Sequence, residues 1–340
     1  MDFLLTIAKP HIGIFTAIDS VHSEQFGNPA EIAREEVKML KSTLEIGFLN
    51  ANDTYAIQLK DHLQIDYLTY QTEGHDIIAD IYFKDEKFFV ADFKGGVGVQ
   101  FLLRIKEKKY SISTNILGKA NYGYIGLWIA IAGILDYKDA RAEARPENPI
   151  LKNGSHEVLE LQYHLQPGRL SVFRGKENSV IIDSTYNASP LSVRKIINTA
   201  HNIKTQLFPQ RKLWLVLGDM RELGDLTERE HRMIAGYVSQ AADHVILVGK
   251  CMIDYLADEL EKVGYDKNKI DKFYDANIAG RHIQKMLKEV GDECLVVCKG
   301  SQNTIFLEEA VKHFLLNPEN QKELTRQSDW WLSKKKKYFE

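Results

Sequence analysis

From about Arg169 onward, the chain alternates short apolar runs with longer segments that repeat apolar residues every three or four positions. Such runs are typical of buried strands and such segments of helices. We expect strands near residues 179–183, 213–217, 244–248, 271–274 and 293–298, and helices near 190–206, 227–241, 252–263, 277–289 and 303–316. Thr227 and Glu230 form a candidate capping box, and His231 in the same helix is expected at the surface. The alternation predicts a Rossmann-like, doubly wound parallel sheet.

The first part of the chain has a less regular pattern. Strand-like runs are expected at Ile12–Ile18, Glu45–Asn50, Ile77–Phe83, Phe88–Ala91 and Val99–Ile105. Turns such as Asp85-Glu86 and Gly95-Gly96 separate them, and a long helix is expected over Lys119–Asp136. The charged stretch at 137–154 predicts a loop, with a short helix between it and Pro167-Gly168. This part predicts a mixed sheet.

The length of the chain is that of about two domains, at 340 residues with 44% apolar content. We expect an α/β protein with a partial central ATPase-type mixed sheet in residues 1–165 and a Rossmann-like domain in 166–320. The tail, 321–340, carries Trp330-Trp331 and the lysine run Lys334–Lys337. That run predicts a solvated helix face, with a phosphate- or partner-binding patch as the alternative.

Charge and cysteine content narrow the class of protein. A formal net charge of −3 gives no nucleic-acid footprint. The longest apolar stretch, Gly123–Leu135, is too short to cross a bilayer, and the amino terminus has no signal-peptide pattern, so we expect a cytoplasmic protein without membrane insertion. The three cysteines are typical of a reducing compartment. Cys294 and Cys298 fall on one face of an expected strand and are interpreted as buried thiols rather than metal ligands.

Polar residues gather where two of the expected strands end. Asp183 follows the apolar run Val180–Ile182, and Pro190 opens the next helix, where its missing N–H costs nothing. Gly218-Asp219 leaves the run Leu213–Leu217 in the same way. In an open parallel sheet, ligands bind at the edge formed by the carboxyl ends of the strands. A ligand site is therefore expected at this edge.

Longer motifs around these strand ends resemble those of the Mur ligase family. Asp183–Pro190 (Asp-Ser-Thr-Tyr-Asn-Ala-Ser-Pro) and Leu217–Gly224 (Leu-Gly-Asp-Met-Arg-Glu-Leu-Gly) resemble the family's carboxyl-terminal domain, in the branch that adds D-alanyl-D-alanine to UDP-N-acetylmuramoyl-tripeptide. Further resembling segments are Pro167-Gly168-Arg169, Lys299-Gly300-Ser301 with Glu308, the histidine segment 18–27, and the turn Asn50-Ala51-Asn52-Asp53. The resemblance spans nearly the whole chain.

Two expected elements of the family, a UDP-sugar domain and a phosphate loop, are missing from the sequence. A Mur ligase normally has a domain for the UDP-sugar and then a central domain opened by a phosphate loop (P-loop) ending in Gly-Lys-Thr or Gly-Lys-Ser. The Gly-Lys pairs of this chain, at 118–119, 175–176 and 249–250, are followed by neither Ser nor Thr. We therefore expect a chain that starts partway through the central domain. The preferred interpretation is that the chain is a fragment of a complete ligase. The alternatives are a non-catalytic binding module and one half of a split ligase, whose partner chain supplies the P-loop.

The resemblance implies ATP-dependent amide ligation in peptidoglycan precursor synthesis. ATP would convert a carboxylate of UDP-N-acetylmuramoyl-tripeptide into an acyl phosphate, and the amine of D-alanyl-D-alanine would attack it. Magnesium ions (Mg²⁺) and cationic side chains would neutralise the phosphoryl charge.

Several roles in the carboxyl-terminal part follow from the resemblance alone. Arg169 would approach the ATP phosphates, with a structural salt bridge as the alternative. Asp183 would contact the ribose, and Asn187 would lie in the nucleotide-facing turn.

The incoming amino component has its own implied residues. Lys299 and Ser301 would hold it, with Lys299 either paired to the dipeptide carboxylate or capping the sheet edge. Asp219 and Glu222 would orient the amine, although Asp219 could equally cap a helix.

The first part of the chain departs from the family pattern. His22 matches a histidine that helps to hold a magnesium ion, whereas Glu36 stands where the ligases carry a carbamylated lysine. A glutamate offers the same charge and the same hard oxygen ligands, so Glu36 either replaces the carbamate or is a solvated helix carboxylate. Asn121 matches a residue near the adenine, but Ala120 and Tyr124 replace a histidine and an asparagine of the family there, so this segment departs from the family's nucleotide contacts.

Overall fold

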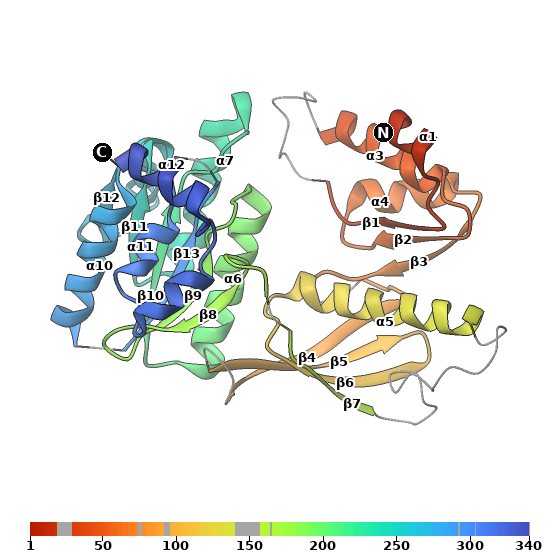
Figure 1. Cartoon of the computed structure of the whole chain (residues 1–340), viewed down its shortest axis with the longest axis horizontal. Coiled ribbons are helices and arrows are strands. Elements are labelled where there is room, and N and C mark those ends of the chain that lie inside the picture. Colours follow the sequence, from red (N-terminus) through yellow and green to blue (C-terminus); the bar gives the residue numbers. More distant parts are fainter. Residues whose placement is uncertain are drawn as a thin grey trace. The chain divides into compact units, whose positions relative to one another are not determined.

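The computed structural model describes residues 1–18, 29–73, 77–91, 96–139, 157–163, 165–291, 293–302 and 304–339. The chain forms two compact units, one built from most of residues 1–163 and the other from residues 164–340 together with 88–97. Each unit contains one sheet with its own helices (Figure 1). The predicted architecture, a mixed sheet followed by a doubly wound parallel sheet, is confirmed.

The first unit is built on a seven-stranded sheet with the order β1-β2-β3-β4-β5-β6-β7. The strands are β1 Ile12–Phe15, β2 Ile46–Asn50, β3 Asp66–Tyr70, β4 Ile81–Val90, β5 Val97–Ile105, β6 Lys108–Thr114 and β7 Glu157–Leu161. The pairs from β1 to β4 are parallel, whereas β5 and β6 are antiparallel. Its helices are α1 Asp2–Ile7, α3 Pro29–Lys41, α4 Thr54–Leu59, the 3-10 turn η1 Lys60–His62, and α5 Lys119–Asp139.

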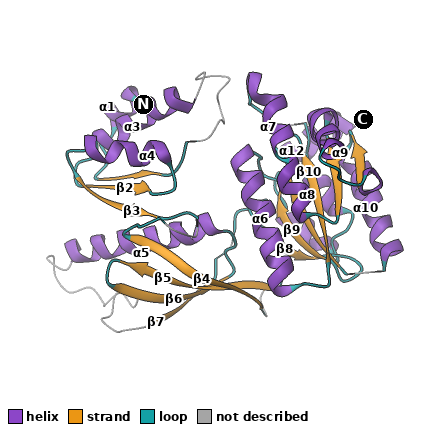
Figure 2. Cartoon of the chain, turned by 180° about the vertical axis from the view of Figure 1, so that it is seen from behind, coloured by secondary structure: helices purple, strands orange, loops and turns teal. Residues whose placement is uncertain are grey.

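Helix α5 lies along the sheet beside β4 and β5 (Figure 2). It packs on these two strands through aromatic side chains. The Tyr122 ring stacks on Phe101 with their centroids 4.4 Å apart and meets Phe83 edge-on at 5.3 Å. At Gly126, a Cβ atom would lie 2.6 Å from Ile81 and 2.7 Å from Leu103, so any other residue would require these side chains to shift. The long apolar helix expected from the sequence therefore covers the sheet of its own unit.

The second unit is a six-stranded sheet with the order β12-β11-β10-β13-β9-β8. The strands are β8 Ser171–Arg174, β9 Val180–Ser184, β10 Lys212–Gly218, β11 His244–Val248, β12 Ile270–Phe273 and β13 Cys294–Lys299. All pairs are parallel except β8 with β9. The helical segments are α6 Pro190–Leu207, η3 Gly224–Leu226, α7 Thr227–Met233, α8 Ala235–Ala241, η4 Met252–Ala257, α9 Asp258–Lys262, η5 Lys267–Lys269, α10 Ala276–Val290, α11 Glu308–Lys312, η6 Pro318–Glu323 and α12 Asp329–Phe339.

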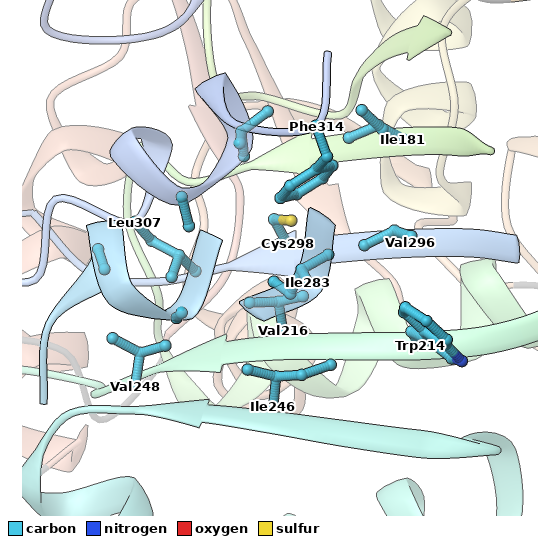
Figure 3. Close-up of a cluster of buried hydrophobic side chains, with 14 of the residues drawn as sticks. Ile181, Trp214, Val216, Ile246, Val248, Ile283, Val296, Cys298, Leu307 and Phe314 are labelled. Carbon is cyan, nitrogen blue, oxygen red and sulfur yellow. The ribbon is translucent and has the colours of Figure 1, made fainter. Parts of the chain in front are cut away.

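A large buried cluster fills one face of this sheet (Figure 3). Trp214 and Cys298 come from neighbouring strands, and Ile283 and Phe314 come from the segments that cover them. Cys294 and Cys298 share this face, as predicted, and both are buried thiols that form no disulfide. Burial raises the pKa of the Cys298 thiol well above its ordinary value, so it stays protonated in the core.

Two local predictions in the first unit were wrong. Asp85-Glu86 does not end a strand, because β4 runs from Ile81 to Val90. Asp85 takes a positive φ of 59°, yet it lies within the strand. The short helix expected before Pro167-Gly168 is instead strand β7, which pairs parallel with β6.

Two predictions at helix α7 were also wrong. Thr227 does not cap it, because the turn η3 runs directly into the helix and the Thr227 hydroxyl donates to the carbonyl of Gly224 at 2.7 Å. His231 is fully buried rather than exposed. A capping box does occur at α6, where Ser189 and Ser192 bond reciprocally and Pro190 opens the helix as expected. No helix among the described residues is long and apolar enough to cross a membrane.

Candidate functional site

Three strand ends meet at one edge of the second sheet. Strand β13 lies between β9 and β10, although it comes last in the sequence. Its final residue, Lys299, is in register with Ser184 of β9 and Leu217 of β10. The loops that follow these three strands therefore start side by side, and they carry most of the predicted site residues.

Lys299 is a buried cation at the centre of this edge. It is only 6% exposed, and its ammonium donates to the carbonyl oxygen of Asn187 and to Ser184 Oγ at 3.4 Å. Burial, and to a lesser extent the nearby charge of Arg169, lower the pKa of Lys299 to about 7, although the charge of Asp183 opposes the shift. A ligand carboxylate or phosphate would favour its charged form.

Asp183 precedes Ser184 in strand β9, and its side chain is fully buried. Its Oδ1 accepts from the Thr185 N–H at 3.0 Å and the Thr185 hydroxyl at 2.7 Å. Its Oδ2 is one of the few buried side-chain nitrogen or oxygen atoms without a hydrogen-bond partner in the described part of the chain. Burial raises the pKa of Asp183 to about 6, although the bonds from Thr185 oppose the shift. The orphaned oxygen is available to a donor.

The turn after β9 brings Asn187 and Arg169 to the same edge. The Asn187 side chain bonds locally to the N–H of Ala188 at 2.9 Å, and its carbonyl receives Lys299. Arg169 is exposed, and its guanidinium lies 4.2 Å from the centre of the Tyr186 ring. A stacked, exposed guanidinium keeps its hydrogen-bond donors available to an anion.

Ser301 and Asp219 tie two of the loops together. The buried Ser301 hydroxyl donates to the carbonyl of Ala188 at 3.1 Å and accepts the N–H of Arg221 at 3.1 Å. Asp219 Oδ1 accepts the N–H of Met252 at 2.8 Å. Asp219 follows strand β10, but it bonds to the first residue of the helical segment η4, which follows β11. This contact fits the alternative that Asp219 caps a helix.

Glu222 lies at the rim of the same edge. Its backbone has a positive φ of 63°, and its Oε1 accepts from Gln302 Nε2 at 3.4 Å. It is partly exposed, whereas Ser301 is fully buried. Glu222 is therefore the more accessible of the residues predicted to hold the amino component.

Asp219, His231 and Cys251 offer ligand atoms within 4.8 Å of one another, the one such group in the described ranges. His231 Nε2 accepts the N–H of Met220 at 3.0 Å, which leaves Nδ1 to carry the proton towards the carbonyl of Thr227 at 2.7 Å. Burial lowers the pKa of His231, so the ring stays neutral. Because both ring nitrogens are committed, we interpret the group as support for the turn after β10 rather than as a metal site.

The first unit has its own polar edge at the end of β2. Asn50 Nδ2 donates to the carbonyl of Thr16 at 2.5 Å, and Asn50 Oδ1 accepts the Thr72 hydroxyl at 3.1 Å. Asn52 Oδ1 accepts the Thr72 N–H at 2.7 Å. The asparagine side chains of this turn thus bond to the segments that follow β1 and β3.

Asp53 completes the turn and is satisfied at both oxygens. Oδ1 accepts the Ala56 N–H at 2.8 Å and caps α4, whereas Oδ2 accepts the Ile18 N–H at 2.8 Å. The motif recognised in the sequence at 50–53 is therefore a structural clamp on its strand ends.

The predicted metal and adenine residues of the first unit are placed less fully. His22 lies outside the described residues. Glu36 is exposed on α3, whose opposite face buries Val37 and Leu40. Asn121 lies in the first turn of α5 and donates to the carbonyl of Leu117 at 2.6 Å. These positions leave the roles of Glu36 and Asn121 as predictions.

Sequence reasoning missed three contributors to the second-unit edge. Ser184, which receives Lys299, and Arg326, described below, have no local signal because their partners lie far away in the sequence. His231 did have one, since it repeats at helical spacing with the buried residues Ile234, Ala235 and Val238. That periodicity would have predicted its burial.

Two family profiles match the chain. The Mur ligase middle domain matches residues 2–123, and the Mur ligase glutamate ligase domain matches residues 168–302. A UDP-N-acetylmuramoyl-tripeptide–D-alanyl-D-alanine ligase of Borreliella burgdorferi is 26% identical over 306 residues, which cover 89% of this chain and 58% of that protein. The ligase of the same name from Bacillus subtilis is 25% identical over 328 residues, or 94% and 62%.

Solved structures give the same fold. MurF from Acinetobacter baumannii superposes with a TM-score of 0.65 at 18% identity, covering 91% of this chain and 60% of that one. MurF ligase from Thermotoga maritima, solved in complex with ADP, gives 0.64 at 19% identity, covering 96% and 65%. The chain thus spans about three fifths of the length of these relatives. With both domains matched, the chain belongs to the Mur ligase family.

Proposed function

We propose that this chain forms the middle and carboxyl-terminal parts of an ATP-dependent ligase that joins D-alanyl-D-alanine to UDP-N-acetylmuramoyl-tripeptide. The observation that carries the proposal is the edge where β9, β10 and β13 end. A buried lysine, a carboxylate with an unused oxygen and an exposed arginine meet there. The names of the curated relatives supply the substrates.

Lys299 is the proposed anchor for the dipeptide carboxylate. Its ammonium already lies against the carbonyl of Asn187, so its stem is ordered before any ligand arrives. A carboxylate that replaced this weak partner would form a charge-assisted bond in a site with little water. Ser301 would act indirectly, because its hydroxyl is used to join the loops. Asp219 and Glu222 would orient the dipeptide amine towards the activated carboxylate.

The nucleotide contacts are proposed at the same edge. Asp183 Oδ2, buried and unpartnered, would accept a hydrogen bond from a ribose hydroxyl, and Asn187 lies in the turn beside it. Arg169 would approach the phosphates, where an exposed, stacked guanidinium can compensate developing negative charge. In the first unit, Asn121 of α5 is proposed separately, from the family resemblance, as a residue near the adenine.

Magnesium would neutralise the phosphoryl charge when bound. Glu36 and His22 are its proposed ligands. The exposed carboxylate of Glu36 has the hard oxygens that magnesium prefers, and no core contact holds it away from solvent. Comparing the magnesium dependence of ATP turnover between the unaltered protein and Glu36→Ala tests this ligand, and an unchanged dependence would remove it.

Phosphate release by the purified chain tests the function directly. The assay contains magnesium, ATP, UDP-N-acetylmuramoyl-tripeptide and D-alanyl-D-alanine, with each omitted in turn. Release that requires all of them supports a ligase complete in this chain. Calorimetry with the dipeptide alone and with ADP provides the second arm.

The second arm separates the remaining explanations. Dipeptide or ADP binding without phosphate release would place this chain as the binding part of a longer ligase, or of one whose P-loop is on a partner chain. If the chain binds a ligand but adding a P-loop domain does not produce ATP turnover, the chain is better explained as a non-catalytic module. A folded chain that binds neither ligand would refute the assignment of this edge.

A further inference from the structure

Arg326 is a buried arginine that precedes the last helix, α12. It is 8% exposed, and its guanidinium forms a two-bond ion pair with Glu308, at 2.8 Å from Nε and 2.6 Å from Nη2. Glu308 is itself fully buried at the start of α11. The backbone of Arg326 takes a positive φ of 55°, which is costly for a residue with a side chain. The surrounding contacts therefore hold this residue in place.

The same guanidinium reaches the turn after β9. Nη1 donates to the carbonyl of Tyr186 at 3.0 Å, and Nη2 donates to the carbonyl of Thr185 at 2.8 Å. Arg326 thus joins a carboxylate of α11 to two successive carbonyls of the turn. A planar guanidinium can make these bonds together, whereas a lysine ammonium is a point charge on a flexible stem.

This turn carries the groups of the candidate site. Thr185 gives both of its donors to Asp183 Oδ1, and the carbonyl of Asn187 receives Lys299. On its other side the turn is held by Gly168, whose carbonyl accepts the Tyr186 N–H at 3.1 Å. A Cβ at Gly168 would lie 2.8 Å from that nitrogen and 3.2 Å from Thr325, so the three segments are closely packed.

A second cation fixes the tail to the same carboxylate. Lys335 of α12 is 3% exposed and pairs with Glu308 at 2.8 Å and with Glu309 at 2.6 Å. The basic run was predicted to be a solvated face, and Lys335 departs from that prediction because α12 packs this residue against α11. The tail therefore supplies two buried positive charges to the base of the site.

We propose that Arg326 is a positioning residue, which holds the turn at Thr185 and Tyr186 so that Asp183 and Lys299 keep their places. The tail 324–339 is then part of the site's support rather than an appendage. The contacts of Arg326 with Thr185 and Tyr186 hold the turn whatever its ligand. That the turn serves a nucleotide or dipeptide site rests on the proposed function.

Hydrogen exchange of the Thr185 and Tyr186 amides tests this role without any ligand. The variant is Arg326→Lys, which keeps a charge for Glu308 but cannot bridge both carbonyls. Its matched control is Arg211→Lys. Arg211 also pairs with a glutamate, Glu293, at 2.9 Å and donates to the carbonyl of Asn178 at 2.5 Å, at the opposite ends of the same strands.

We expect both amides to exchange about tenfold faster in Arg326→Lys, the factor that corresponds to one net hydrogen bond. Arg211→Lys should leave them unchanged. Lys335→Gln should change them less than Arg326→Lys, because Lys335 does not touch the turn. Exchange equal to that of the unaltered chain, or accelerated only in parallel with the core amides of β10, would overturn the proposal. A lysine variant that failed to fold would overturn it too, since the role would then be global.

ADP binding links the result to the site. If the unaltered chain binds ADP, Arg326→Lys should weaken that binding about tenfold, whereas Arg211→Lys should not. Unchanged ADP affinity in Arg326→Lys, with the turn loosened, would sever the turn from the ligand and overturn its role in the site. If the unaltered chain does not bind ADP, the proposed function fails, and the exchange result still decides whether Arg326 holds the turn.

Discussion

The two sheets of this protein both end in polar turns, but the turns differ in how their side chains are satisfied. In the first unit, each oxygen of Asp53 accepts a backbone N–H at 2.8 Å. In the second, Asp183 has one satisfied oxygen and one buried oxygen without a partner. Lys299, beside it, is buried against neutral oxygens only.

This difference separates a structural edge from an edge suited to a ligand. Buried polar groups are nearly always paired in folded proteins, so an orphaned oxygen and a lysine with a pKa of about 7 lower the stability of the free protein. A ligand that supplies the missing partners would recover that free energy. Motif resemblance marked both turns equally, and only their hydrogen bonds distinguish them.

The largest expected effect is that of Lys299→Met on ligand binding. Affinity for D-alanyl-D-alanine should fall by about 100-fold or more, since a buried charge partner is lost. The free energy of unfolding should be unchanged or higher, because methionine fills the space without a desolvated charge. Calorimetry and urea unfolding measure the two quantities. A strong loss of stability would instead make Lys299 a structural cap of the sheet edge.

The stability of the second unit should depend on pH through Asp183. Burial raises the pKa of Asp183 to about 6 from 3.8, so between these values the folded chain holds a proton that the unfolded chain has released. Stability from this group therefore falls as pH rises through that window, by about 3 kcal/mol in all.

Asp183→Asn should flatten that part of the profile, measured as unfolding free energy against pH. Asp61→Asn, at an exposed position of η1, serves as the control and should leave the slope unchanged. Equal slopes in the unaltered protein and Asp183→Asn would mean that the carboxylate is solvated.

At the turn after β2 in the first unit, truncation of a side chain should lower stability and leave ligand binding unchanged. Asp53→Ala removes the cap of α4 and the bond to Ile18, and should lower the unfolding free energy by about 2 kcal/mol without changing the affinity for dipeptide. Asp61→Ala is the matched control, with an expected change near zero. A weaker dipeptide affinity in Asp53→Ala would show that the first edge also touches ligand.

The smallest effect is a pH dependence of dipeptide binding. Since the pKa of Lys299 is about 7, each pH unit above that value should weaken binding of the carboxylate by about tenfold. N-acetyl-D-alanyl-D-alanine keeps the carboxylate but has no titrating amine, so its profile isolates the lysine. Affinity that is constant from about pH 7 to pH 9 would show that Lys299 is not the anchor.

Strand and helix periodicity was enough to predict the five parallel strands of the second sheet, but not the antiparallel strand β8. Strand β9 and helix α6 were placed within one residue of their observed ends, because a fully apolar run and a proline at a helix start are strong local signals. The end of β9 also marked Asp183 as a candidate. Local signals fail where the chain keeps its direction despite a turn residue, as at Asp85.

The state of the site could not be predicted from the sequence. That Lys299 lies against the carbonyl of Asn187 depends on the insertion of β13 beside β9, which only the fold reveals. The contact of Arg326 with Thr185 joins residues separated by 141 positions. Such contacts set burial, and burial sets the pKa values, so they lie beyond motif and spacing.

The late position of β13 also has a consequence for how the protein is made. Strands β9 and β10 are synthesised first but pair with each other only through β13, whose six residues are all buried. Until β13 has been synthesised through Lys299, β9 and β10 each have one side without a strand to pair with. Their pairing must wait for a contact between distant parts of the chain. A chain cut short before that residue would lack the middle of its sheet. Nascent chains of this protein should therefore depend on chaperones until β13 has been synthesised.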